Sequence, residues 1–424
     1  MTLDTSSTVA VVGASLAGLR AAETLRAEGH TGALVLIGAE SHLPYDRPPL
    51  SKQFLAGTWG LDRVVLRPPE KIASLGLDVR LGHVAGGLDL EGHALELDDG
   101  SVVHFDGLVL ATGAHPRPLP GAPSLAGVHT LRTLEDSIAL GRSARAEGAR
   151  VVVVGAGFIG SEVAATCRGL GARVTVVEAL PQPLARVLGT EMGALCGALH
   201  RDHDVELLTD VGVSGLRSDA EAPSTSAAAS RTAAGDAMGA RVVGVELDDG
   251  RVLDADVVVI GIGVVPTTQW LEGSGLEVSD GVVADATLHA ADDVVAAGDV
   301  ARWFDQGREA LIRIEHWTNA AEQGVAAARS LLAGRARADA YVPVPYFWSD
   351  QYDVKIQVIG HPGPDDDVIV VDGSAHERRL VALYGRGGRF SAALGFSRPR
   401  QLMAYRPLLE SGASFEEALS HRPA

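Results

Sequence analysis

Cysteine is almost absent from this sequence. Its 424 residues include only Cys167 and Cys196, and no Cys-x-x-C pair or other metal-ligand spacing occurs. We therefore expect neither a disulfide framework nor a metal site. Cys167 stands within an apolar helical pattern over 163–170, which predicts a small buried side chain.

Positive charge and long apolar runs are also lacking. The formal net charge of −18 disfavours nucleic acid or an anionic membrane as a partner. No apolar run reaches the roughly 18 residues of a membrane span. No basic residue precedes Arg20, unlike the start of a signal peptide. These absences predict a cytoplasmic protein.

Aromatic residues are scarce, whereas small and aliphatic residues abound. Only 4% of the chain is aromatic, 46% is hydrophobic, and 50 residues are glycine. This composition suits a parallel α/β protein with turns built from small residues. The length suits roughly two to four domains.

A pattern typical of dinucleotide binding begins at residue 9. Residues 9–12 and 34–37 predict buried strands, and residues 16–28 predict a helix between them. Gly13, Ser15 and Gly18 have the spacing that allows a tight turn, a nearby pyrophosphate and close helix packing. Glu40 follows the second strand, where a carboxylate can bind a ribose. Because Ser15 replaces the usual glycine, an ordinary strand–turn–helix remains an alternative for this stretch alone.

A second and better copy occupies residues 151–178. Four valines predict the strand, and Gly155, Gly157 and Gly160 open the helix. Glu178 ends the next strand at about the expected distance of 20 residues from the first glycine. No arginine follows Glu178, and a carboxylate repels a 2′-phosphate, so this copy favours NADH over NADPH.

Similar segments follow each copy and indicate an internal duplication. Residues 94–103 and 245–253 both contain Asp-Asp-Gly, which predicts a hairpin turn, and a buried strand with a glycine-containing end comes next in each half. Each half is thus predicted to bind one dinucleotide. Residues 294–298 predict a strand that places Asp299 just before a helix. Residues 217–240 lack periodicity and predict a flexible insertion without a site.

The C-terminal region differs in composition from the rest. Residues 342–360 are strand-like and aromatic, and they open a separate α+β domain. Between residues 377 and 406 there are seven arginines and one acid. Two interpretations remain open: a solvated face with salt bridges, or a docking patch for an acidic partner. The arginines are Arg378, Arg379, Arg386, Arg389, Arg398, Arg400 and Arg406.

These segments together resemble the FAD-dependent NADH:ferredoxin reductases, a group that includes putidaredoxin reductase, rubredoxin reductases and the reductase components of dioxygenases. The resemblance rests on PYDRPPLSK, LATGAHPRPLP, LRTLEDS, VVGAGFIGSEVAA, GDVAR, EHWTNA and FWSDQYDVKIQ. It implies a glutathione reductase-like α/β fold with two Rossmann-type domains and an α+β C-terminal domain. The implied FAD domain covers residues 1–115 and 248–328, the NAD domain 116–247 and the interface domain 329–424.

The resemblance also implies roles for individual residues. The residues implied to bind FAD are Gly13, Ser15, Ala17, Gly18, Glu40, Arg47, Lys52, Ala85, Ala111, Thr112, Gly113, Arg132, Asp299 and Trp317. Those implied to bind NAD are Gly155, Gly157, Ile159, Gly160, Glu162, Glu178, Arg186, Gly263 and Glu315. Glu162 is expected near the nicotinamide and Trp317 beside the flavin. Lys52 could instead be a solvated charge, and Trp348 either lies near the flavin or packs at an interface.

The implied reaction moves a hydride from NADH to FAD and then single electrons to a small acidic iron–sulfur protein, which feeds a cytochrome P450 or a ring-hydroxylating oxygenase. The protein supplies orientation and electrostatics, so no catalytic side chain is required. Disulfide reductases of this fold carry cysteine near the first motif, and residues 41–57 contain none. The alternatives are an NADH reductase of quinone or monodehydroascorbate, and a redox-sensing binding protein resembling apoptosis-inducing factor. A monomer or a weak dimer is expected.

Overall fold

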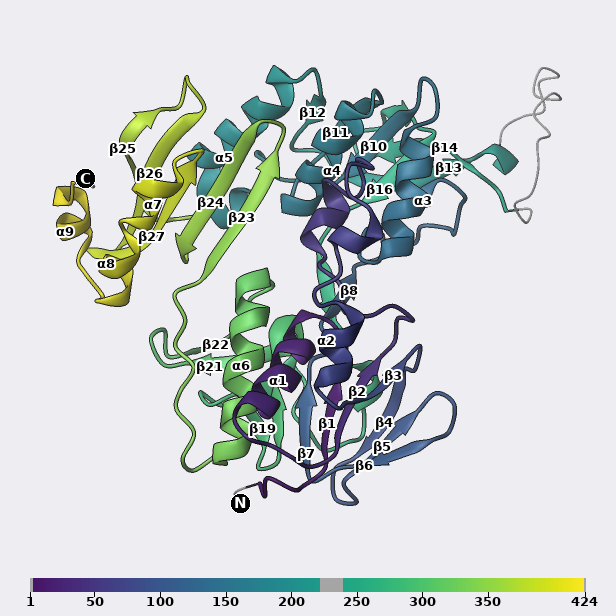
Figure 1. Cartoon of the computed structure of the whole chain (residues 1–424). Helices are drawn as coiled ribbons and strands as arrows, with labels where there is room; N and C mark the ends of the chain where they lie inside the picture. The colour runs from purple at the N-terminus through teal and green to yellow at the C-terminus, as the bar shows by residue number, and fades with distance from the viewer. Residues whose placement is uncertain (1–2, 222–238, 423–424) are drawn as a thin grey trace. The chain divides into compact units, whose positions relative to one another are not determined.

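The computed structural model describes residues 3–221 and 239–422 (Figure 1). Most of the insertion predicted at 217–240 lies outside the described residues. The chain divides into two compact units. Unit 1 contains residues 1–48, 61–115 and 264–347, and unit 2 contains residues 49–60, 116–263 and 348–424.

Unit 1 is built on a six-stranded sheet in the order β19-β20-β7-β1-β2-β3, which is parallel except for β19. Apolar side chains on both faces of β1 explain its continuous hydrophobic run, because a strand in the middle of such a sheet is covered on both sides. The strands are β1 (Val9–Val12), β2 (Leu34–Gly38), β3 (Asp78–Leu81), β7 (Gly107–Leu110), β19 (His289–Ala291) and β20 (Val294–Ala296).

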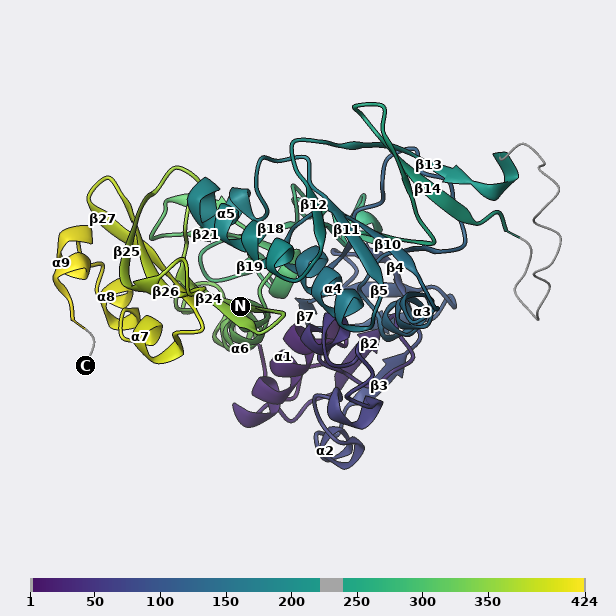
Figure 2. The same cartoon turned by 90° about the horizontal axis from the view of Figure 1, so that it is seen from above.

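Two helices cover one face of this sheet. Helix α1 (Leu16–Ala27) and helix α6 (Trp317–Ala333) lie side by side in both views (Figures 1 and 2). Val9 and Val11 point into this core together with Leu25 of α1. The opposite face carries the antiparallel sheet of β4 (Ala85–Asp89), β5 (Ala94–Leu97) and β6 (Val102–His104).

Unit 2 repeats this plan with a five-stranded parallel sheet in the order β12-β11-β10-β16-β9. One face packs against α3 (Leu134–Ala144) and α4 (Phe158–Gly169), and the other against an antiparallel sheet of three strands. The parallel strands are β9 (Val128–His129), β10 (Arg150–Val154), β11 (Arg173–Val177), β12 (Glu206–Leu208) and β16 (Val257–Ile260). The remaining elements are α5 (Ala185–Asp202), β13 (Val213–Ser218), β14 (Val242–Leu247) and β15 (Val252–Asp254).

The two predicted Asp-Asp-Gly hairpins are confirmed as the β5–β6 and β14–β15 turns. The first aspartate of each turn, Asp98 or Asp248, forms an equivalent hydrogen bond. Asp98 accepts a hydrogen bond from the backbone N–H of Val84, and Asp248 accepts one from that of Gly212, both at 3.0 Å. The similarity between the two halves of the chain therefore includes an equivalent hydrogen bond at each hairpin.

A C-terminal sheet completes unit 2, in the order β23-β24-β27-β26-β25. Its core includes the fully buried Tyr384 and Phe396. The strands are β23 (Tyr346–Gln351), β24 (Val354–Gly360), β25 (Asp367–Ser374), β26 (Arg379–Arg386) and β27 (Arg389–Phe396), followed by α7 (Pro399–Met403), α8 (Arg406–Glu410) and α9 (Phe415–Ser420). The strand prediction for residues 342–360 is confirmed for 346–360.

The helix predicted after Asp299 is wrong. One 3-10 turn (Gly298–Val300) leads directly into strand β21 (Ala301–Asp305). Trp303 and Asp305 face inward and alternate with Arg302 and Phe304, which is the period of a strand.

The other elements are β8 (Ala114–Pro116) paired with β17 (Val264–Pro266), the sheet of β18 (Val282–Ala284), β21 and β22 (Ala310–Ile312), α2 (Pro69–Ser74), and 3-10 turns at Pro48–Ser51, Leu61–Arg63, Asp219–Glu221 and Gln269–Leu271.

None of the helices in the described part of the chain is long and apolar enough to cross a membrane.

Helices α1 and α4 approach their sheets closely because of one glycine in the first turn of each. A Cβ atom on Gly18 would lie 1.9 Å from the carbonyl oxygen of Gly13, and one on Gly160 would lie 2.1 Å from that of Gly155. A larger residue must push the helix away from its strand.

We predict that Gly160→Ala lowers the free energy of unfolding by about 1–3 kcal/mol, because the added methyl group meets backbone that cannot move aside. Urea unfolding of the purified protein measures the change. The control is Gly169→Ala in the same helix, where an added Cβ meets no atom within 4 Å. The control should unfold at the same urea concentration as the wild type or slightly above it. Equal midpoints for Gly160→Ala and the wild type would contradict the close approach.

Candidate functional site

A cavity in unit 1 opens at the carboxyl ends of β1 and β2, where ligands bind in open parallel sheets. The residues predicted from the sequence that line it are Gly13, Ser15, Glu40, Arg47, Ala85, Ala111 and Thr112. Sequence reasoning missed the remaining lining residues, which are Val12, Ala14, Ile37, Gly38, Ala39, His42, Tyr45, His83, Val84, Thr267 and Trp270. Val12, Ala14 and residues 37–39 lie within the first motif, whereas Thr267 and Trp270 come from a distant part of the chain that no local motif links to it.

The floor of this cavity is the glycine turn between β1 and α1. Gly13 has φ +117°, and a Cβ there would lie 2.0 Å from the carbonyl oxygen of Ala111. Ser15 is the extended N-cap of α1, and its side chain makes no capping hydrogen bond. The first N–H groups of the helix are therefore presented without a side-chain cap, which suits a phosphate group. The turn has the cradle that a pyrophosphate requires.

A polar cluster lies at the side of the cavity where Glu40 ends the second strand. The Glu40 carboxylate accepts hydrogen bonds from Arg47 Nη2 at 2.6 Å and from the hydroxyl of Tyr45. Arg47 Nη1 also donates to the Tyr45 hydroxyl at 3.1 Å. Burial alone would lower the pKa of Arg47, but attraction to Tyr45 and Glu40 outweighs it and raises the pKa. A carboxylate has about four acceptor positions, so Glu40 keeps capacity for a ribose diol.

Other residues predicted for FAD lie in unit 1 outside the cavity lining. Trp317 is 37% exposed, and its indole N–H donates to Asp46 Oδ1 at 2.6 Å. The backbone carbonyl of Asp299 accepts a hydrogen bond from Arg313. Ala17 and Gly18 lie on α1 behind the glycine turn, and Gly113 follows β7 with φ +68°.

Unit 2 has the same turn at the predicted NAD motif. Gly155 has φ +98°, and a Cβ there would lie 2.5 Å from the carbonyl oxygen of Gly261. Gly157 is the extended N-cap of α4, and an added Cβ at this position meets open space. Glu178 is fixed at the end of β11, because it accepts hydrogen bonds from the N–H groups of Ala156 at 2.7 Å and Leu180 at 2.9 Å.

The remaining residues predicted for NAD are distributed over both units. Ile159 is 49% exposed in the first turn of α4, and Arg186 is exposed in the first turn of α5. Gly263 follows β16 with φ +102°. Glu315 lies in unit 1, where Arg313 pairs with it at 2.6 Å.

Glu162 of α4 is a buried carboxylate with four donors. It is 3% exposed and accepts hydrogen bonds from Ser51 Oγ at 2.5 Å, Lys52 Nζ at 2.7 Å, Ser349 Oγ at 2.8 Å and the N–H of Asp350 at 3.3 Å. Lys52 is therefore not a solvated charge. Loss of either charged partner would leave a buried charge uncompensated.

The segment that carries Lys52 is held within unit 2 through its backbone carbonyl groups. Ser137 Oγ donates to Leu50 at 2.8 Å, Thr166 Oγ1 donates to Ser51 at 2.7 Å, and Arg145 Nη2 donates to Leu55 at 2.6 Å. Residues 49–60 thus follow the first glycine motif in sequence but belong to unit 2. Arg132, also predicted for FAD, lies in unit 2, where its N–H donates to Asp136 at 2.8 Å.

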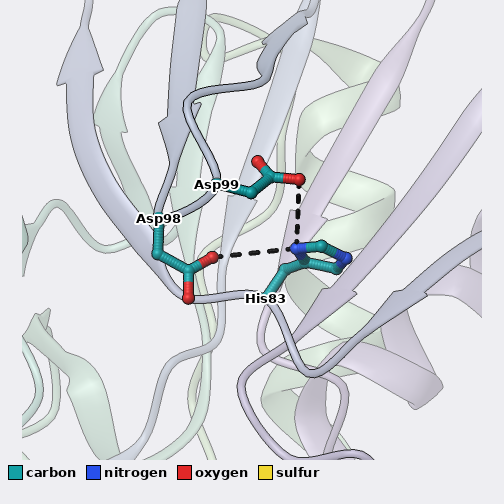
Figure 3. A group of neighbouring side chains, drawn as sticks. All are labelled: His83, Asp98 and Asp99. Carbon is teal, nitrogen blue, oxygen red and sulfur yellow. Dashed lines mark ion pairs between the residues drawn. The ribbon is translucent and has the colours of Figure 1, made fainter.

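One group of side chains within the described residues is close enough to hold a metal ion. Figure 3 shows the imidazole of His83 turned toward Asp98 and Asp99, with Nδ1 at 3.7 Å and 3.5 Å from their oxygens. Both carboxylates serve the hairpin turn, and hydrogen bonds from Ser101 lower the pKa of Asp99. Asp248 repeats the role of Asp98 without a histidine beside it, so the turn itself explains the cluster.

Both cysteines are free and fully buried, which confirms the prediction for Cys167. Burial raises the pKa of each thiol to about 12. Burial thus disfavours the thiolate of both residues near neutral pH, and the thiolate is the form needed for disulfide exchange.

The C-terminal arginines divide into two groups. Four of them are ion-paired: Arg378 with Asp202, Arg386 with Asp366, Arg398 with Asp372 and Arg406 with Glu410, at 2.5–3.2 Å. Arg379, Arg389 and Arg400 are exposed and form no ion pair with any described residue. Salt bridges therefore account for four of these seven arginines.

Comparison with known proteins agrees with this geometry. The family model described as pyridine nucleotide-disulphide oxidoreductase matches residues 7–324, and the one described as reductase C-terminal matches residues 346–423. Rhodocoxin reductase of Rhodococcus erythropolis is 35% identical over 95% of this chain and 89% of its own length. The ferredoxin–NAD(+) reductase component of the anthranilate 1,2-dioxygenase system of Burkholderia cepacia is 38% identical over 95% and 94%.

A solved structure gives the same result for the fold. The covalent complex of putidaredoxin reductase with putidaredoxin contains a chain that matches with a TM-score of 0.88 and 30% identity, over 98% of this chain and 96% of that one. This match confirms the predicted glutathione reductase-like fold with two Rossmann-type domains and a C-terminal α+β domain. The chain therefore belongs to the pyridine nucleotide-disulphide oxidoreductase family and, within it, to the ferredoxin reductases.

Proposed function

We propose that the protein is an FAD-dependent NADH:ferredoxin oxidoreductase. It takes a hydride from NADH and passes electrons singly to a small acidic iron–sulfur protein that feeds a cytochrome P450 or a ring-hydroxylating oxygenase. Two relatives named above are a rhodocoxin reductase and a ferredoxin–NAD(+) reductase component of a dioxygenase system, and the solved complex pairs putidaredoxin reductase with putidaredoxin.

The state of the two cysteines carries this proposal. Members of the wider family that reduce disulfides need an accessible thiolate, whereas Cys167 and Cys196 are 0% exposed with pKa values raised to about 12. Electrons that enter this protein therefore leave without a protein thiol as an intermediate. We therefore infer an acceptor outside the chain, and the match of residues 346–423 to the family model described as reductase C-terminal supports this inference.

The residues around the unit 1 cavity fit FAD. Gly13 and Ser15 present the first turn of α1 to a pyrophosphate, and Glu40 with Arg47 offers acceptors and donors to a ribose. Bound FAD supplies the chemistry of accepting a hydride and releasing electrons one at a time. The protein binds and orients the cofactor, and its side chains undergo no covalent change.

The turn in unit 2 fits NADH. Gly157 leaves room for a pyrophosphate at the N-terminus of α4, and Glu178 is held where a ribose diol can reach its remaining acceptor positions. A 2′-phosphate would place two negative charges next to this carboxylate, and the next two residues, Ala179 and Leu180, supply no cation.

Reduction of cytochrome c through an added [2Fe–2S] ferredoxin tests the proposed function. We expect the purified FAD-containing protein with NADH to reduce cytochrome c at least about tenfold faster when a suitable ferredoxin is present, because electrostatic complementarity accelerates protein association. The control replaces ferredoxin with a quinone at the same concentration. Rates that do not respond to any ferredoxin, together with rapid quinone reduction, would show that the acceptor is a small molecule.

A substitution at Glu178 tests the ribose assignment. Glu178→Gln removes the negative charge and keeps the size of the side chain, so we expect the NADH/NADPH ratio of kcat/KM to fall about tenfold, mainly through weaker NADH binding. Glu206→Gln on the neighbouring strand β12, where Glu206 accepts a bond from Thr175, is the matched control and should leave the ratio unchanged. The assignment is wrong if both variants keep the wild-type ratio.

A further inference from the structure

A chain of three polar side chains joins the β23–β24 hairpin to the nucleotide-binding fold of unit 2; His200 and Ser161 are buried, and Tyr352 is half-buried. His200 lies near the end of α5 and is 0% exposed. Its Nδ1 atom is 2.7 Å from the hydroxyl of Tyr352, which stands between β23 and β24, and its Nε2 atom is 3.3 Å from Oγ of Ser161 on α4. Three segments far apart in sequence thus meet at one imidazole. Figure 1 shows β23 and β24 in light green and α4 and α5 in teal.

The protonation state of His200 fits its two hydrogen-bond partners. Burial, together with the positive charge of Arg201 and the neighbouring His203, lowers the pKa of His200 to about 4, so the ring is neutral at neutral pH. A neutral imidazole donates from one nitrogen and accepts at the other. Hydroxyl groups stand on both sides, and each can donate or accept, so both tautomers satisfy every partner.

Tyr352 is held in a conformation that it would not adopt by itself. Its φ of +56° is in the left-handed region, which costs energy for a residue with a bulky side chain. The phenol ring stacks on His203 with centroids 4.0 Å apart and planes within 9°. His203 in turn lies 3.5 Å from Asp353 of the same turn. The turn is therefore fixed by contacts with the end of α5.

The hairpin has a second attachment on the same helix. Ser161 is followed by Glu162, whose carboxylate accepts hydrogen bonds from Ser349 Oγ and from the N–H of Asp350 on β23. Two consecutive residues of α4 therefore hold the hairpin, one directly and one through His200. Helix α4 begins at the glycine motif of the predicted NAD site, and β23 carries Trp348.

We propose that His200 and Tyr352 are positioning residues for electron transfer to the iron–sulfur protein, because they keep the β23–β24 hairpin in a fixed position on α4. The proposal rests on the proposed function. The hairpin opens the C-terminal region of 346–423, so a displaced hairpin changes the geometry available to a protein acceptor. Misplacement by about 1 Å can cost orders of magnitude in rate. A small diffusible acceptor does not dock on a protein surface, so a displaced hairpin should not change its rate of reduction.

Tyr352→Phe tests the positioning role because it removes only the hydroxyl that pairs with His200. The aromatic ring and its stacking on His203 are retained. The matched control is Tyr384→Phe. The buried hydroxyl of Tyr384 donates to the carbonyl of Leu188 at 3.0 Å and so also joins the C-terminal sheet to α5, but it forms no hydrogen bond with the described residues of α4 or of the hairpin turn. Each variant loses one phenol hydrogen bond, which is buried at Tyr384 and half-buried at Tyr352. Ser161→Ala removes the other end of the chain and serves as an independent second variant.

We expect Tyr352→Phe and Ser161→Ala to lower kcat/KM for ferredoxin about threefold to tenfold, the range of one hydrogen bond, while NADH oxidation with ferricyanide changes less than about twofold. Hydrogen exchange should accelerate in residues 346–360 of these variants. Tyr384→Phe should keep the wild-type ferredoxin rate and show faster exchange in residues 379–396 instead.

Equal effects of Tyr352→Phe and Tyr384→Phe on the ferredoxin rate would overturn the proposal, since a general loss of stability would then explain both. Unchanged exchange in residues 346–360 would overturn it as well. The wild-type rate separates the two proposals. A wild-type protein that reduces no ferredoxin contradicts the proposed function, whereas a fast wild type with an equally fast Tyr352→Phe variant contradicts only the positioning role.

Discussion

The close approach of backbone to backbone at two glycine turns is the constraint on which the rest of the structure depends. At Gly13 and at Gly155, the end of the first strand touches the end of a neighbouring strand so closely that no Cβ atom fits. This contact places the N-terminus of the following helix at the edge of the sheet, next to the acid that ends the second strand. The fold thus prepares two equivalent anion-binding sites from one local rule.

Local rules of this kind are why much of the fold could be predicted from the sequence. The glycine turns, the acids Glu40 and Glu178 and the paired Asp-Asp-Gly hairpins each depend on residues close together along the chain. The helix expected after Asp299 was wrong because a capping aspartate is a common signal, and the alternation around Trp303 outweighed it. The Glu162 site could not be derived, because Ser51 and Ser349 reach it across more than a hundred residues. Lys52 and Glu162 were each singled out for a cofactor, but nothing in the sequence pairs them.

The arrangement within unit 2 joins the proposed NAD site to the C-terminal sheet. Helix α4 starts at the predicted NAD motif. Its Glu162 pairs with Lys52 of residues 49–60, and the helix holds β23 and the turn after it through Glu162 and His200. Buried polar groups are satisfied at each of these points, which favours a single arrangement over several. The cysteines contribute only packing. If the electrons leave to an acceptor outside the chain, the protein needs a fixed surface on which the acceptor can dock. It does not need a reactive side chain.

The central claim is that unit 1 binds FAD and unit 2 binds NADH, and substitution of the residue at each helix N-cap tests it most directly. Ser15 and Gly157 both have extended backbone, which valine adopts readily, and a Cβ on Gly157 meets no atom. The measurement is the FAD content of each purified variant together with its affinity for NAD⁺. The account predicts that Ser15→Val loses FAD, and that Gly157→Val keeps FAD but binds NAD⁺ at least about tenfold more weakly. The reverse pattern, or loss of both ligands in Gly157→Val with an intact fold, would contradict the assignment.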